Sequence, residues 1–188
     1  MADTDVPHCT AFLALRRIAA GPYAQVAREL AHADLASGSV LVFDDASGAQ
    51  VDLPLASDLV AEPVSAPQVG RPRLGVVARE VTLLPRHWDW LALQPGGASA
   101  ALRRLVDEAR QRHAARDTQR LAQERTYRCM SALAGGLPGF EEAARALFAP
   151  NAEAFAQHSA AWPDDVQSYL RWLARDAFGP GADTAPAA

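Results

Sequence analysis

The stretch REVTLLPRHWDWLALQPGGASAALRRLVDEAR, residues 79–110, decides the fold of the middle of the chain. Its first six residues include Val, Thr and two Leu, which predicts a short strand over residues 79–84. Pro85 suits the first position of a helix, and Gly96-Gly97 predicts a turn after that helix. Beyond the turn, apolar side chains recur at helical spacing, at Leu102, Leu105, Val106 and Ala109. The order of elements is therefore a strand, a short helix, a turn and a longer amphipathic helix.

The longer helix is expected to continue well past this stretch. Residues 111–134 keep a helical composition with Arg- and Gln-rich faces, and Gly135-Gly136 then ends the helix. A central unit is thus predicted over residues 73–134.

The chain before this unit begins with a small α+β unit, residues 1–56. Residues Thr10–Ile18 are apolar and partly alternating, which predicts a strand. Pro22 follows Gly21 and suits the first position of a helix that ends near His32.

A hairpin and a linker complete the N-terminal part. Two β-rich runs, Val40–Phe43 and Gln50–Leu55, flank the sequence Asp-Asp-Ala-Ser-Gly, which is typical of a hairpin loop. Residues 57–72 carry three prolines and little periodicity. This composition predicts a linker between the N-terminal unit and the central unit.

The chain after the central unit predicts a helical subdomain over residues 135–178. One helix has an apolar stripe that starts at Phe140, and another starts near Pro163. Residues 179–188 are rich in Gly, Pro and Ala and predict a disordered tail. The expected fold class is α+β, mostly helical.

Composition narrows the class of protein. Of the 188 residues 49% are apolar, enough for a core, and no run of about 18 apolar residues predicts a membrane helix. The N-terminus has no basic region before an apolar one, so we expect no secretory signal and a cytoplasmic protein. Cys9 and Cys129 lie far apart, and no histidines stand at metal-ligand spacing. No cofactor and no metal are expected.

Charge is unevenly distributed along the chain. Residues 1–70 hold three Arg and nine acidic residues, a net charge of −6. Residues 71–128 hold twelve Arg and six acidic residues, a net charge of +6, and residues 129–188 return to −4. A basic middle between acidic ends indicates either an anionic partner or neutralisation by the acidic parts of the same protein.

Three segments resemble a known bacterial family. They are GRPRLGVVAREVTLLPRHWDWLALQPGGASAALRRLVDEAR, LVFDDASGAQVDL and MSALAGGLPGFEEAARALF. All three are similar to the uncharacterised family catalogued as domain of unknown function 2239. This resemblance implies membership of the family but supplies no activity.

The order of elements over residues 79–110 also resembles the ribbon-helix-helix unit of DNA-binding dimers. That resemblance implies a strand in the major groove and phosphate bound at the start of the second helix. The residues expected on the DNA are Arg71, Arg73, Arg79, Thr82, Arg86 and Ser99, the last as the cap of the second helix. The residues expected in a dimer core are Val81, Leu83, Trp88, Leu102, Leu105 and Val106.

One feature departs from this pattern. In ribbon-helix-helix proteins, the residues one, three and five positions before the helix-opening proline point inward. Measured from Pro85, this phase would bury Glu80 and expose Val81 to the bases. The opposite phase buries the aliphatic side chains but turns Glu80 toward DNA, where phosphates would repel its carboxylate. Two functions therefore stay open: a homodimeric DNA-binding regulator, or a protein-interaction and assembly module without nucleic acid.

Other polar groups have simpler interpretations. Asp44 and Asp45 are typical turn formers of the hairpin loop, and Glu141-Glu142 suits the start of a helix. Cys129 lies in a helical, apolar context that indicates packing. No catalytic motif is present, so we expect no catalytic residues.

Overall fold

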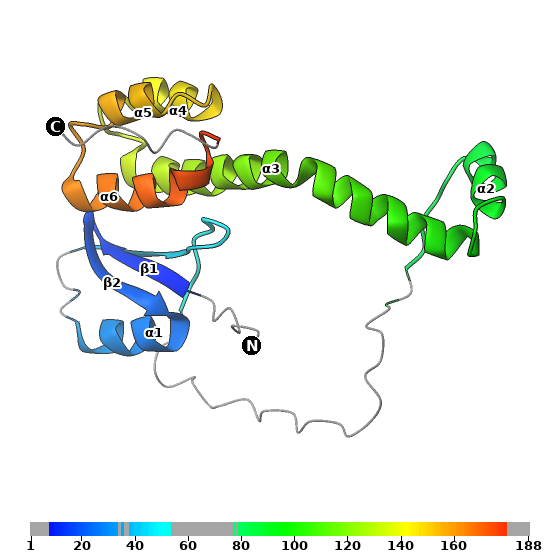
Figure 1. Ribbon diagram of the computed structural model, residues 1–188. Coiled ribbons are helices and arrows are strands. Elements are labelled where there is room, and N and C mark those ends of the chain that lie inside the picture. The colour runs from blue at the N-terminus through cyan, green and yellow to red at the C-terminus, as the bar shows by residue number, and fades with distance from the viewer. Residues whose placement is uncertain (1–7, 34, 36–37, 54–76, 78, 180–188) are drawn as a thin grey trace. The chain divides into compact units, whose positions relative to one another are not determined.

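Three strands and six α-helices make up the part of the chain that the computed structural model describes, residues 8–33, 35, 38–53, 77 and 79–179 (Figure 1). The fold is α+β and mostly helical, as the sequence predicts. Contacts divide the chain into two units. The first contains residues 1–60 and 115–188, and the second contains residues 61–114.

The first unit contains a three-stranded antiparallel sheet in the order β2-β1-β3. Its strands are β1 (His8–Leu13), β2 (Arg16–Pro22) and β3 (Val40–Asp44). The prediction of one strand over residues 10–18 is wrong, because the chain reverses direction at Ala14-Leu15. Ala14 has a left-handed φ of 54°, which makes the reversal tight enough for Leu13 to pair with Arg16.

Helices pack on both faces of this sheet, which explains why β1 is buried along nearly its whole length. Successive side chains of a strand point to opposite faces. Cys9 and Ala11 pack in one hydrophobic cluster with Val26 of α1 (Tyr23–His32). Phe12 packs in the other cluster, where its ring centroid lies 5.3 Å from that of Tyr169 in α6 (Asp164–Leu173). Figure 1 shows the two helices on either side of the strands.

The predicted hairpin after β3 is present in a reduced form. The Asp44 amide donates to the Ala49 carbonyl at 2.9 Å, and the Val51 amide donates to the Val42 carbonyl at 2.8 Å. The returning chain forms only an isolated bridge, between Phe43 and Gln50, rather than a strand of its own. Residues 54–55 of the predicted run lie outside the described residues.

The larger core of the first unit is formed by helices distant in sequence from the sheet. The prediction that the long helix reaches residue 134 is confirmed: α3 spans Gly97–Ala134, 38 residues. Its last turns pack with Phe12 and Phe43 of the sheet and with the helices that follow. These are α4 (Phe140–Phe148), α5 (Ala152–His158), α6 and a short 3-10 helix, η2 (Ala174–Asp176).

Helix α5 (seven residues) escapes the sequence prediction because so short a helix with one buried side chain leaves no apolar stripe. The side chain of Asn151 accepts a hydrogen bond from the Ala154 amide at 2.9 Å, and Phe155 supplies the one buried side chain of this helix. In α4, Ala143 and Leu147 of the predicted stripe are buried, whereas Phe148 is exposed. Across the described residues, every helix is too short or too polar to span a membrane.

Candidate nucleic-acid interface

The second unit, in its described residues 77 and 79–114, contains α2 and the first turns of α3. The strand predicted over residues 79–84 is absent from the structure: the segment is irregular and only Leu83 is half-buried. A strand needs a neighbour for its backbone hydrogen bonds, and the described residues of this unit form no other strand.

Helix α2 (Pro85–Ala92) begins where the sequence predicts. Pro85 occupies its first turn, and the Leu84 carbonyl accepts the His87 amide at 2.8 Å. Leu91 is the one buried side chain of α2. Trp88, predicted for the dimer core, is 40% exposed in the single chain.

The turn between the helices depends on its two glycines. Gly96 and Gly97 have φ values of 80° and 75°, a left-handed region that side chains with a Cβ rarely adopt. Because α3 already begins at Gly97, Ser99 lies inside the first turn of the helix. The prediction that Ser99 caps this helix is therefore wrong. Its carbonyl oxygen instead accepts a hydrogen bond from Arg103 Nε at 3.2 Å.

The apolar side chains of this unit remain largely uncovered. Leu102 is half-buried, and Leu105 and Val106 are exposed, the latter by 54%. Before α2, Val81 is 52% exposed. Leu91 and Ala101 are the only buried residues in the described part of the unit. Of the residues predicted for a dimer core, Leu83 and Leu102 are thus half-buried in the single chain, and the other four, Val81, Trp88, Leu105 and Val106, are exposed.

The arginines of the same unit are exposed as well. Arg104 pairs with Glu108 at 3.8 Å, and this is the one ion pair among the described residues of the unit. The exposed arginines without an acidic partner there are Arg79, Arg86, Arg103, Arg110 and Arg112. Thr82 and Ser99 are exposed too, whereas Arg71 and Arg73 lie outside the described residues.

A polar cluster lies in the first unit, around a loop for which the sequence predicts only a hairpin turn. Thr10 Oγ1 and the Tyr169 hydroxyl both donate to Asp45 Oδ1, at 2.9 and 3.0 Å. Cys129 Sγ lies 3.9 Å from the Tyr169 hydroxyl and 3.6 Å from the Gly48 carbonyl oxygen. Residues from β1 and α6 thus converge on one carboxylate of the loop, and Cys129 of α3 lies beside the tyrosine hydroxyl.

The ionisation of this cluster does not favour catalysis. Burial raises the pKa of Cys129 to about 12, so its thiol is not a ready nucleophile. Burial also raises the pKa of Tyr169 and of Asp45. Burial alone would raise the pKa of Asp44, but hydrogen bonds from Ser47 and Tyr23 outweigh it and lower that pKa. These groups bond to one another, which is the pattern of a structural core.

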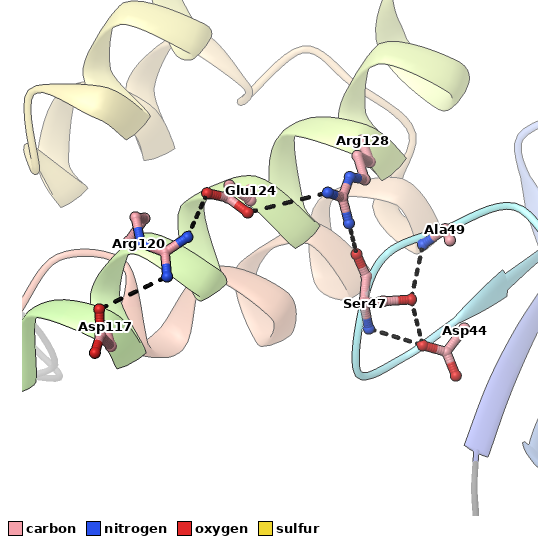
Figure 2. Close-up of polar contacts among 7 residues, drawn as sticks. All are labelled: Asp44, Ser47, Ala49, Asp117, Arg120, Glu124 and Arg128. Carbon is pink, nitrogen blue, oxygen red and sulfur yellow. Dashed lines mark hydrogen bonds and ion pairs between the residues drawn. The ribbon is translucent and has the colours of Figure 1, made fainter. Parts of the chain in front are cut away.

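An exposed arginine of helix α3 also binds the same loop. Figure 2 shows a ladder of exposed charges along α3, in which Arg120 pairs with Asp117 at 3.6 Å and with Glu124 at 2.9 Å. Glu124 in turn lies 4.0 Å from Arg128, and Arg128 Nη1 donates to the Ser47 carbonyl at 2.8 Å. The loop residue Ser47 also donates from its amide to Asp44 Oδ1 at 2.8 Å. Arg120 and Arg128 are therefore engaged within the first unit.

A metal site is not formed by the described side chains: nowhere in that part of the chain do three His, Cys, Asp or Glu residues gather. The second unit is the better candidate for a binding surface. It combines uncovered apolar side chains with arginines that have no acidic partner among its described residues.

Comparison with known proteins identifies the family. The family described as "Uncharacterized protein conserved in bacteria (DUF2239)" matches residues 8–174, and the chain belongs to it. The match includes β1, the central unit and the helices through α6. No curated protein and no solved structure matches the chain.

Proposed function

We propose that the protein is a cytoplasmic DNA-binding protein that acts as a homodimer, with its second unit as the dimerisation and DNA-binding part. The observation that carries the proposal is the exposure of five arginines without an acidic partner among that unit's described residues, beside an apolar face. Its biological role would be that of a transcriptional regulator.

The apolar face supports the dimer. A unit that buries only Leu91 and Ala101 among its described residues has almost no core of its own. A second copy that covers the exposed Leu105 and Val106 removes these side chains from water. This burial stabilises the dimer by roughly 25 cal/mol per Å² of apolar surface. Leu102 and Trp88 would join them, as would Val81 and Leu83 from the preceding segment.

The exposed arginines are the evidence for an anionic partner. Uncompensated guanidinium groups repel one another, and a phosphate backbone supplies the opposite charge with release of bound counterions. Arg110 and Arg112 lie on α3, and Arg79 and Arg86 lie at or before α2. In the proposed complex they contact phosphates, with Thr82 and Ser99 as neutral donors and Arg71 and Arg73 as further basic groups.

The test is fluorescence anisotropy of the full-length protein on a duplex from its own upstream region. If about six to ten phosphates are contacted, affinity should fall roughly a thousandfold between about 50 and 200 mM salt. Replacing Arg110 and Arg112 together by Ala should lower the salt slope by about two. Arg145→Ala is the matched control, since Arg145 is exposed and pairs with Glu142 in the first unit. Absence of binding at the low salt would overturn the proposal.

A second candidate is a protein-interaction or assembly module without a nucleic-acid role. The specific observation in its favour is that residues 79–84 form no strand and include Glu80 among exposed side chains. A dimer that forms normally yet binds neither duplex nor single-stranded DNA at about 50 mM salt would support this candidate. A search for protein partners would then follow.

A further inference from the structure

One face of α2 combines a cation with an exposed aromatic ring. Arg86 and Trp90 are four residues apart, one helical turn, so they lie on the same face. Trp90 is 48% exposed, and Arg86 makes no ion pair with a described residue of its unit. Trp88 lies on the face of Leu91 instead, because three residues separate them. The indole of Trp90 is therefore separate from the predicted dimer side of α2.

The segment before α2 does not favour reading of duplex bases. A ribbon in the major groove requires paired strands with donors and acceptors at its outer positions. Residues 79–84 are irregular, and Glu80 is exposed among them, where its carboxylate would face the phosphates. Within the unit, α2 offers an exposed planar ring and a guanidinium on one face.

We propose that α2 binds single-stranded DNA, with an unpaired base stacked on Trp90 and the adjoining phosphate bound by Arg86. This inference goes beyond the proposed function, whose ligand is duplex DNA, and adds single-stranded DNA as a second ligand of the same unit. Stacking on an exposed indole requires a base outside the double helix, and it tolerates every sequence because each base has a π face. Other exposed arginines of the same unit, Arg79 and Arg110 among them, supply the charge that follows the backbone.

The other tryptophans provide the contrast. Trp162 is 3% exposed and donates from Nε1 to the Pro138 carbonyl at 2.8 Å. Trp172 is exposed, but one ring neighbour is Tyr169 at 6.1 Å and Arg175 lies over the ring at 4.7 Å. Trp172→Ala is therefore a matched control, since it removes an exposed indole whose neighbours already stack on it.

The experiment measures anisotropy of the full-length protein with a fluorescein-labelled thymidine oligonucleotide and with a duplex, each about 20 nucleotides long, at about 50 mM salt. Trp90→Ala should weaken binding of the single strand roughly tenfold or more, because each stacked base contributes substantially to such complexes. Trp90→Phe keeps a ring and should recover most of the affinity. Trp172→Ala should bind like the unaltered protein.

Each contrary outcome is distinguishable. Equal binding of the single strand by Trp90→Ala and the unaltered protein overturns this inference while leaving duplex binding by the protein intact. Loss of dimer mass in light scattering with Trp90→Ala would assign Trp90 to the dimer interface and also overturn it. Failure to bind the single strand at all would likewise overturn this inference, whereas failure to bind the duplex would overturn the proposed function.

Discussion

Gly48 and Arg125 are in direct backbone contact, although they lie far apart in the sequence. A Cβ placed on Gly48 would clash with the Arg125 carbonyl oxygen, and Gly48 has a left-handed φ of 67°. The tip of the loop after β3 therefore packs against the main chain of α3. Arg125 is held in turn at its side chain, where Nε donates to the Leu173 carbonyl at 2.9 Å and Nη2 pairs with Asp176 at 3.0 Å.

This contact makes Gly48→Ala strongly destabilising. The methyl group meets backbone atoms that cannot rotate away, and the left-handed backbone adds strain, so the loss should be about 2 kcal/mol or more. Urea unfolding followed by circular dichroism measures it. Gly136→Ala is the control, because a Cβ there meets nothing within 4 Å and should change stability little. Equal midpoints for the two variants would contradict the prediction.

Much of the helical architecture follows from local sequence. Pro85 fixes the start of α2, and Gly96-Gly97 separates it from α3. The helical composition after the turn predicts a helix to residue 134. The reversal at Ala14 has no such signal, because alanine at a left-handed φ is rare and the apolar run continues across it. The sequence therefore predicts a single strand where the structure has a hairpin.

The polar cluster was beyond sequence reasoning for a different reason. Tyr169 and Asp45 are 124 residues apart, and a hydrogen bond between such distant residues leaves no periodic pattern. The sequence indicates that Asp45 is a turn former, which its loop position supports, but its carboxylate also accepts a hydrogen bond from Thr10 of β1. The arginines of the second unit are an excess of positive charge that the sequence shows, but the charge distribution leaves open whether acidic parts of the protein neutralise them. Their lack of acidic partners there depends on the fold.

Asp45 predicts a pH dependence of stability with a definite sign. Burial raises its pKa in the folded protein above the ordinary value of 3.8. The folded state therefore binds this proton more tightly than the unfolded state, and the contribution to stability is complete below pH 3.8. That contribution is lost as pH rises through the raised folded-state pKa.

Asp45→Asn isolates this effect, because its amide oxygen can still accept from Thr10 and Tyr169. The free energy of unfolding of the unaltered protein, minus that of the variant, should decrease as pH rises upward from 3.8. Denaturant midpoints at successive pH values give this difference. A difference that grows with pH would mean that hydrogen bonds to the ionised carboxylate outweigh burial.

Cys129 should be chemically inert in the folded protein. It is fully buried, and burial raises its pKa to about 12, so almost no thiolate is present at pH 8. Cys9 is also buried, with a pKa raised to about 11. An aromatic disulfide reagent at pH 8 should therefore modify neither cysteine until the protein is unfolded, when both should react. Rapid labelling of the folded protein would instead show that the core around Tyr169 opens readily.

Val106→Glu should convert the proposed dimer to a monomer. Val106 is 54% exposed in the single chain and belongs to the apolar face of the second unit, so a carboxylate there would be buried without a partner on association. Light scattering measures the mass, and a shift of about 3 kcal/mol in association would weaken a dimer more than a hundredfold. Leu121→Glu is the control, since Leu121 is equally exposed on α3 but lies in the first unit. If Val106→Glu keeps the dimer mass while Leu121→Glu loses it, copies associate through the first unit and the dimer face has been assigned to the wrong part of α3.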